Sequence, residues 1–141
     1  ELHLTHEYSK TISALQEIAE SHRDIVIRSY LHISNHHKGL LDVQIREIRE
    51  VENILSGMLT SISATLLQEH SMETTTLQND LDTLKSKIQQ FDKNQIERIQ
   101  DETSKTRLSI LFYGILGNMQ KIAEQTVSLL DIFHDSFEKR R

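Results

Sequence analysis

No proline interrupts this chain of 141 residues, and glycine occurs only four times. Proline ends or kinks helices, because it lacks a backbone N–H and its ring clashes with the preceding turn. A fold rich in strands or loops would need more turn-forming residues than this sequence holds. The sequence therefore predicts long helices joined by short connections. A chain of this length is expected to fold as one domain that can bury most of its apolar surface.

The most apolar part of the chain is residues 108–120, which lie between Arg107 and Lys121. Apolar residues continue beyond it at helical spacing as far as Phe137. Only this segment is apolar around most of its circumference, so we expect it to be the central helix against which the others pack. Its uncharged stretch is shorter than the roughly 20 residues that cross a bilayer. We therefore expect a core helix, with no direct membrane insertion.

Two amphipathic helices are expected before the central part of the chain. The first is predicted to start after Thr5, with Ser9 and Thr11 as later capping alternatives, and to end in the polar segment 34–39. The second is predicted to be capped by Asp42 and to end in the threonine-rich segment 68–76. In the first helix, the positions expected to be buried are Ile12, Leu15, Ile18, Ala19, His22, Ile25, Val26, Ser29, Tyr30 and Ile33. In the second, they are Ile45, Ile48, Val51, Leu55, Leu59, Ile62 and Leu66. The opposite face of the second helix is expected to be solvated and ion-paired, and it carries Arg46, Glu47, Arg49, Glu50 and Glu52.

A third helix is indicated by apolar residues at alternating spacings of four and three. They are Leu77, Leu81, Leu84, Ile88 and Phe91. Residues 92–94 are a candidate break, after which the stripe resumes at Ile96 and Ile99. The final helix is then predicted to begin at Asp92 or near Thr103. Four such segments without strand alternation predict an all-α chain, folded over residues 1–141 as an antiparallel up-and-down four-helix bundle.

The charges of the chain argue against some partners. The net charge is −5 and no cysteine is present. Acidic and basic residues are interleaved and no predicted helix face carries a basic stripe, so we do not expect a nucleic-acid partner. The absence of cysteine excludes disulfides and thiolate metal or redox chemistry. The sequence begins at Glu1 rather than at methionine, and we expect it to be a piece of a longer membrane protein.

Histidine, which occurs eight times, supplies the first candidate metal ligands. His32 and His36 are four residues apart on one helix face, the geometry with which two imidazoles grip one transition metal. Two ligands alone bind a metal weakly. A polar helix end, with imidazoles near the C-terminal dipole, explains the same residues without a metal. We favour the interpretation of these histidines as a polar helix end over that of a metal site.

A second candidate metal site is the acid-x-x-His spacing of Asp131 and His134. Di-metal carboxylate bundles need this motif from two helices, together with two further glutamates. Glu47 and Glu50 lack a histidine at the matching offset. The sequence also holds no nucleophile-plus-base motif, no glycine-rich phosphate loop and no dinucleotide fingerprint. We therefore predict that the chain is not an enzyme and uses no cofactor.

The predicted central helix contains two glycines and two polar residues of note. Gly114 and Gly117 are expected to let a crossing helix pack closely against bare backbone. Tyr113 and Asn118 are expected to form a buried polar pair at most.

Two stretches of the chain resemble a known family. Residues 119–130 are similar to the signature helix of PhoU-type domains, in their order of apolar, charged and small residues and the apolar stripe that follows. Residues 30–41, followed by 44–50, resemble the C-terminal cytosolic region of bacterial inorganic phosphate transporters of the PiT type. PhoU-type domains hold metal clusters through acid-x-x-x-Asp motifs, but here the first acid is replaced by Gln120 and the second position holds Glu124. A neutral amide does not supply the negative charge that a metal cation requires, so we do not expect this chain to bind the metal clusters of PhoU-type domains.

The resemblance implies a PhoU-like regulatory or assembly domain at the cytoplasmic face of the bacterial inner membrane, within a phosphate transporter. Its partners would be the transmembrane domain of the same chain or a twin copy in a homodimer. Two other functions stay open: a coiled-coil-like signalling or scaffold module, and a metal-binding helical bundle. The repeat in the third helix favours the coiled coil. The nearly all-round apolar final helix disfavours it, since coiled coils keep a narrow apolar seam.

Overall fold

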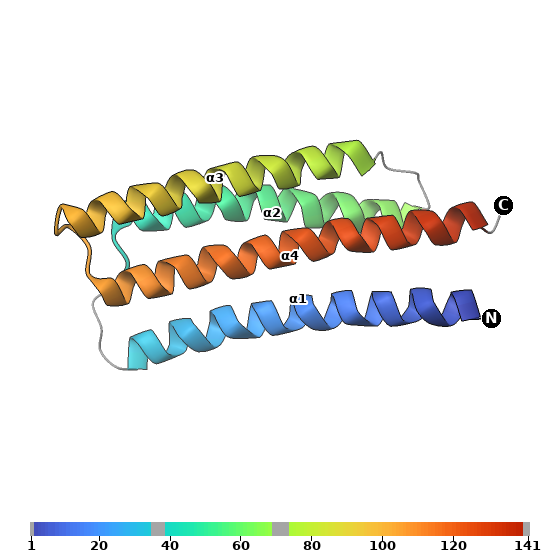
Figure 1. Ribbon diagram of the computed structural model, residues 1–141, viewed down its shortest axis with the longest axis horizontal. Coiled ribbons are helices and arrows are strands. Elements are labelled where there is room, and N and C mark those ends of the chain that lie inside the picture. Colours follow the sequence, from blue (N-terminus) through green and yellow to red (C-terminus); the bar gives the residue numbers. More distant parts are fainter. Residues whose placement is uncertain (1, 35–38, 69–73, 140–141) are drawn as a thin grey trace.

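The computed structural model describes residues 2–34, 39–68 and 74–139, and all regular secondary structure in these ranges is helical. The helices are α1 (Leu2–Ser34), α2 (Asp42–Gln68), α3 (Thr74–Gln100) and α4 (Thr106–Lys139). They lie along one long axis, and the start of α1 and the end of α4 lie at the same end of the molecule (Figure 1). The predicted all-α chain with four long helices is confirmed.

The helix boundaries differ from the predicted ones in several places. α1 already begins at Leu2, so Thr5 lies inside the helix and does not cap it. α2 begins close to the predicted position, but Asp42 is already in its first turn and the carbonyl of Leu41 accepts the first helical hydrogen bond, from Ile45. Gln68 is still helical, and residues 74–76 already belong to α3. The rest of the predicted turn, residues 69–73, lies outside the described residues.

The candidate break at residues 92–94 is wrong, because α3 continues through it to Gln100. Phe91 and Gln95, on either side of this segment, are both buried and hold the helix against the core. The connection to α4 consists of residues 101–105. Of the two predicted starts of the final helix, the one near Thr103 is therefore right and the one at Asp92 is wrong.

α4 is the central helix, as predicted, because in the described part of the chain it alone contacts each of the other three. In Figure 1 it lies between α1 and the pair formed by α2 and α3. Complete burial of a large apolar side chain such as Phe112 or Leu116 contributes about 1.5–3 kcal/mol. The apolar residues of α4 that are buried are Leu108, Leu111, Phe112, Ile115, Leu116, Met119, Ile122, Ala123, Val127 and Leu130.

The apolar stripes of α2 and α3 are confirmed in part. All five residues of the predicted repeat in α3 are buried, as are Val51, Leu55 and Ile62 of α2. Leu59 is exposed, and Met58 is buried in its place. Ile96 and Ile99 are also exposed, while Gln95 faces the core. The stripe of α2 thus departs from the predicted row at one position, and that of α3 keeps its alternating spacing as far as Gln95. The side chain of Leu66 lies outside the described residues.

α1 is attached to the molecule by one helix. Among the described residues it packs against α4 and contacts neither α2 nor α3. Ala14 and Ser21 are buried, and Ile18 and Ile25 pack against the edge of the core. Ile12 and His22 are exposed, contrary to the prediction, because only one side of α1 faces another helix. The other side chains of the predicted stripe, Leu15, Ala19, Val26, Ser29, Tyr30 and Ile33, lie outside the described part.

α3 ends in a backbone motif that fixes the path of the chain into α4. The N–H of Thr103 donates to the carbonyl of Arg98 (2.9 Å), and the N–H of Glu102 donates to that of Ile99 (3.1 Å). These two bonds define a Schellman cap, in which the residue at the position of Glu102 adopts a left-handed conformation and is usually glycine. Glu102 has a φ of 59°. The cap leads into Ser104, which is buried.

Replacing Glu102 by glycine is expected to raise the free energy of unfolding by about 1 kcal/mol, because glycine adopts a left-handed φ without a clash of its Cβ. Urea unfolding followed by circular dichroism measures the change. Glu102→Ala is the matched control: it removes the charge but keeps the Cβ, and it should give no gain. An equal gain from alanine would show that the charge, and not the backbone, is the source.

Candidate functional site

A cluster of buried polar side chains joins α2, α3 and α4 near the connection between α3 and α4. We call it the glutamine cluster, and it consists of Gln44, Gln95, Ser104 and Ser109, all of them buried. Gln44 Nε2 donates to Gln95 Oε1 (3.0 Å) and to Ser104 Oγ (3.3 Å). Gln95 Nε2 donates to Ser104 Oγ and to Ser109 Oγ, at 2.8 Å each.

The hydrogen-bonding capacity of the two glutamines is almost fully used. Gln44 Oε1 accepts a bond from the N–H of Leu41 (2.7 Å), and Gln95 Oε1 accepts a second bond from Arg98 Nη1 (2.9 Å). Gln95 thus uses both of its donors and accepts two bonds. Each such bond contributes about 0.5–1.5 kcal/mol net, whereas a buried amide without partners would be destabilising. Because the partners come from three helices and one connection, the cluster fixes how these helices are aligned.

An ion pair between α2 and α3 lies beside the glutamine cluster. Arg98 Nη2 lies 2.6 Å from Glu47 Oε2, and Asn94 Nδ2 donates to the same oxygen at 2.9 Å. The Arg98 guanidinium also lies over the Phe112 ring, 5.9 Å from its centre. Glu47 is only 6% exposed, so its prediction as part of a solvated face is wrong. Its other oxygen, Oε1, is buried and has no hydrogen-bond partner among the described residues.

Glu47→Gln is expected to lower the free energy of unfolding by about 3 kcal/mol, because it leaves the largely buried Arg98 without its counter-charge. The matched control is Glu50→Gln. Glu50 pairs with Lys87 across the same two helices, but both side chains are largely exposed. Its loss should cost less than about 1 kcal/mol. Equal losses in urea unfolding would contradict the difference that we expect from burial.

A second buried carboxyl lies on α3. Asp92 Oδ1 is buried without a hydrogen-bond partner in the described part of the chain, and burial raises the pKa of Asp92 above its ordinary value of 3.8. On α4, the pKa of Tyr113 is raised above 10.0, first by burial and then by the negative charge of Asp92, while Arg98 acts in the opposite direction. At neutral pH the ionised Asp92 destabilises the fold.

Asp92→Asn is expected to raise the free energy of unfolding at pH 7 by on the order of 1 kcal/mol, because a neutral amide is less costly to bury than a carboxylate. The gain should vanish below the ordinary pKa of 3.8, where Asp92 is protonated in both the folded and the unfolded chain. It should be complete once the pH has passed the raised pKa of the folded state. Unfolding measured across this pH range tests the prediction, and a loss of stability at pH 7 would contradict it.

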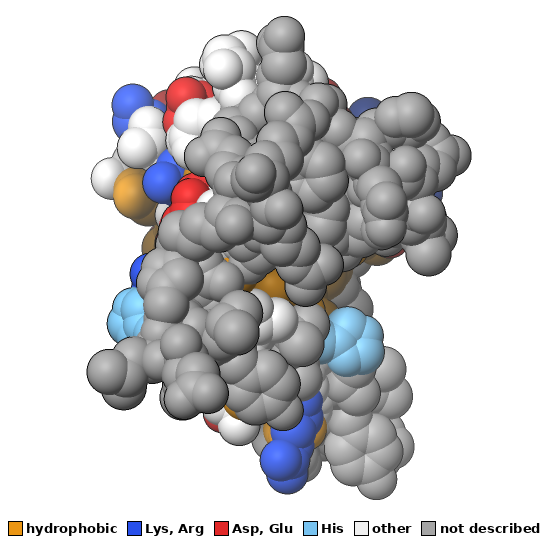
Figure 2. Space-filling model, turned by 90° about the vertical axis from the view of Figure 1, so that its right-hand side faces the viewer, with side chains coloured by type: hydrophobic (Ala, Val, Ile, Leu, Met, Phe, Trp, Pro, Cys, Tyr) orange, Lys and Arg blue, Asp and Glu red, His pale blue; other side chains and the backbone are white. Residues whose placement is uncertain are grey.

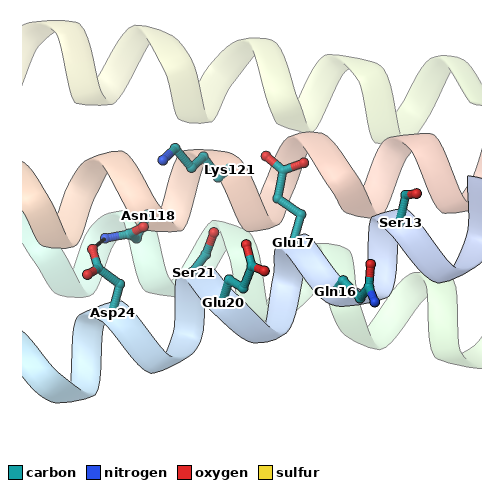
Figure 3. A pocket seen from close by; sticks show the side chains of 8 residues that line it. All are labelled: Ser13, Gln16, Glu17, Glu20, Ser21, Asp24, Asn118 and Lys121. Carbon is teal, nitrogen blue, oxygen red and sulfur yellow. Dashed lines mark hydrogen bonds between the residues drawn. The ribbon is translucent and has the colours of Figure 1, made fainter.

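A polar groove follows the seam between α1 and α4. One hollow of about 530 Å³ is lined by Ser13, Gln16, Glu17, Glu20, Ser21, Asp24, Asn118 and Lys121 (Figure 3). A second hollow, of about 550 Å³, shares Ser13 and Glu17 with the first and extends to His6 on α1 and Asp135 on α4. The two hollows share residues and follow the same seam, and we call them together the α1–α4 groove.

Hydrogen bonds between side chains connect α1 to α4 across this seam. Asn118 Nδ2 donates to Asp24 Oδ2 (2.7 Å), and Figure 3 shows the two side chains turned toward each other. Further along, Gln125 Nε2 donates to Glu17 Oε2 (3.0 Å). The hydrogen bond from Arg28, and then the one from Asn118, lower the pKa of Asp24 below 3.8. The stabilisation by ionised Asp24 is therefore present above that value and is lost as the pH falls through the lowered pKa.

The glycines of α4 differ in their surroundings. A Cβ added to Gly114 would lie 3.2 Å from Cδ of Arg28, so the predicted close approach is confirmed there, although a side chain makes it. Around Gly117 no atom of the described residues lies within 4 Å of such a Cβ, and there the prediction is wrong. Asn118 is buried, but its partners among the described residues are Asp24 and the carbonyl of Gly114 (2.9 Å), not Tyr113.

The candidate metal ligands do not form one site in the part of the chain that the structure describes. His32 lies near the end of α1 and His134 near the end of α4, and these helix ends lie at opposite ends of the molecule (Figure 1). The side chains of both histidines, and the whole of His36, lie outside the described part. Glu124 is hydrogen-bonded within α4, and Asp131 lines the α1–α4 groove. No three His, Asp or Glu residues among those described converge on a point that could hold a metal ion.

Charges of both signs lie on the one face that Figure 2 shows. Figure 2 looks onto the end of the molecule that holds the start of α1 and the end of α4. Among the side chains described there, Lys or Arg and Asp or Glu lie next to each other at the upper left. Within the described ranges, no helix combines the length and the apolar character needed to cross a bilayer.

Sequence reasoning missed the glutamine cluster and the Glu47–Arg98 pair, although a signal for both was present. The alternating spacing that runs from Leu77 to Phe91 continues to Gln95 and then to Arg98. Those two positions therefore belong to the buried row of α3, with polar instead of apolar residues. A buried row that becomes polar near a helix end predicts polar partners on the neighbouring helices.

Comparison of the chain with protein-family models, with curated proteins and with solved structures found no match. The functional argument therefore rests on two polar features, the glutamine cluster and the α1–α4 groove. The glutamine cluster is internal and aligns helices. The α1–α4 groove is accessible and presents hydrogen-bonding groups along about five turns of helix, which suits contact with another chain.

Proposed function

We propose that this chain is a regulatory or assembly domain that works through contacts of its helix faces. The observation that carries the proposal is the position of α1, which packs against α4 alone and leaves its other sides without a helix partner in the described part of the chain. A partner helix can therefore reach both α1 and the adjoining edge of α4. Hydrogen-bonding groups along the α1–α4 groove would orient it.

The biological setting that we propose is the cytosolic tail of a bacterial inorganic phosphate transporter. The resemblance of residues 119–130 to PhoU-type domains, and of residues 30–41 and 44–50 to PiT-type tails, supports it. In this setting the partners are the membrane domain of the same chain and a twin copy. Such a tail regulates transport if it binds one conformation of the transporter better than another.

We further propose that the four helices form one antiparallel up-and-down bundle over residues 1–141. The short connection between α3 and α4 supports this arrangement, as does the placement of the start of α1 and the end of α4 at one end of the molecule. α2, α3 and α4 would form the closed part of the bundle, with α1 added at its side.

A coiled-coil-like signalling or scaffold module is the second candidate function. The regular buried stripe of α3, from Leu77 to Phe91, favours it. The burial of α4 against three helices favours the bundle, because a coiled coil buries a narrow seam.

Sedimentation velocity over increasing concentrations of the purified chain tests the helix-face proposal. We expect a reversible monomer–dimer equilibrium, since the same faces are available on every copy. A chain that stays monomeric at the highest concentrations would refute self-association. The setting is tested separately on the native reading frame upstream of Glu1, where about ten hydrophobic spans are expected for a transporter. A sensor or receptor domain there would support the signalling module instead.

A further inference from the structure

The three helices other than α1 pack against one another. In the described part of the molecule α2, α3 and α4 each contact the two others, so each is held on two sides. Every member of the buried apolar cluster that the structure describes belongs to one of these three helices. α1 adds Ile18 and Ile25 at the edge of that cluster. Separation of α1 would therefore break one helix–helix contact, the most extensive of the four, and leave the other three in place.

The glutamine cluster also connects α2, α3 and α4 without the described part of α1. Its hydrogen bonds connect Gln44 of α2, Gln95 of α3 and Ser109 of α4, and the Glu47–Arg98 pair connects α2 and α3 again. The described part of α1 contributes no residue to either. The interactions that align the core helices thus do not depend on α1, and local opening of α1 is expected to precede unfolding of the core.

The contacts that seat α1 on α4 can be made equally well between two copies. They include the bond from Asn118 to Asp24, the bond from Gln125 to Glu17, and the packing of Arg28 against Gly114. Both partners of each contact are present on every copy. The surface of α4 that binds α1 therefore also fits the α1 of a second copy of this chain.

We propose that α1 exchanges between two copies, so that each α1 lies on the α4 of the other and a domain-swapped dimer forms. The contacts in the dimer are those of the monomer, so the dimer fraction is set by protein concentration and by the connection between α1 and α2. The proposal rests on the proposed function, because it names the helix face and the partner through which assembly occurs. It does not depend on the phosphate transporter setting.

The absence of cysteine makes a clean cross-linking test possible. Glu17→Cys is introduced on α1 in one preparation, and Gln125→Cys on α4 in a second preparation labelled with nitrogen-15. The two are mixed at high concentration and treated with a short bis-maleimide. Exchange of α1 predicts a mixed covalent dimer, joined between positions 17 and 125 and identified by mass spectrometry.

The control pair is Glu50→Cys and Lys87→Cys, which face each other between α2 and α3 within one copy. Because these helices belong to the core, mixing should give only the background of random collisions, and the 17–125 pair should give several times as much. A double variant with cysteine at both 17 and 125 should cross-link within one copy at low concentration. Its failure to do so would count against the proposal, since α1 would then not be seated on this face of α4 in solution.

A mixed 17–125 dimer no more abundant than the control would overturn the exchange. If sedimentation still shows a dimer in that case, α1 does not exchange and assembly uses another helix face, so the proposed function stands. A chain that is monomeric at all concentrations would overturn both proposals.

Discussion

Burial of α4 is the constraint on which the rest of the structure depends. This helix is apolar around most of its circumference, and no single neighbour can cover it. α2 and α3 cover it on one side and α1 on the other, so α4 contacts all three. The free energy gained from side chains such as Phe112 and Leu116 is thus shared among the helices, and each neighbour must present a matching apolar stripe.

Polar interactions decide how the covering helices are aligned. Apolar stripes pack in more than one alignment, because one leucine or isoleucine can replace another at similar cost. The glutamine cluster does not allow this, since a shift of one helix would leave buried amides and hydroxyls without partners. Arg98 further restricts how α2 and α3 can be aligned, because it bonds to both Gln95 and Glu47. The Schellman cap at Glu102 leads the chain into Ser104, which completes the cluster.

The polar contacts between α1 and α4, unlike those of the glutamine cluster, are accessible to solvent. The side-chain hydrogen bonds of this seam lie beside an accessible groove, and the partly exposed Asp24 and Arg28 there are in reach of water. Such contacts contribute less than buried ones and exchange more readily with other partners. A rigid core with one separable helix is a physical basis for assembly or regulation, because a second chain can compete for the same face. The open seam also explains why exposed isoleucines occur on α1, where only one side is covered.

The sequence by itself determined the all-α class, the central place of α4 and the buried stripe from Leu77 to Phe91. These features depend on the absence of proline and on local periodicity, which are properties of contiguous residues. Only the tertiary structure decided that Met58 is buried instead of Leu59, and that Glu47 pairs with Arg98 inside the molecule. Met58 and Leu59 both fit helical spacing after Leu55, so periodicity cannot choose between them, and the choice follows from what the neighbouring helix presents. For the same reason the α1–α4 groove could not be predicted: its two sides lie about a hundred residues apart, and their meeting depends on α1 packing against α4 alone.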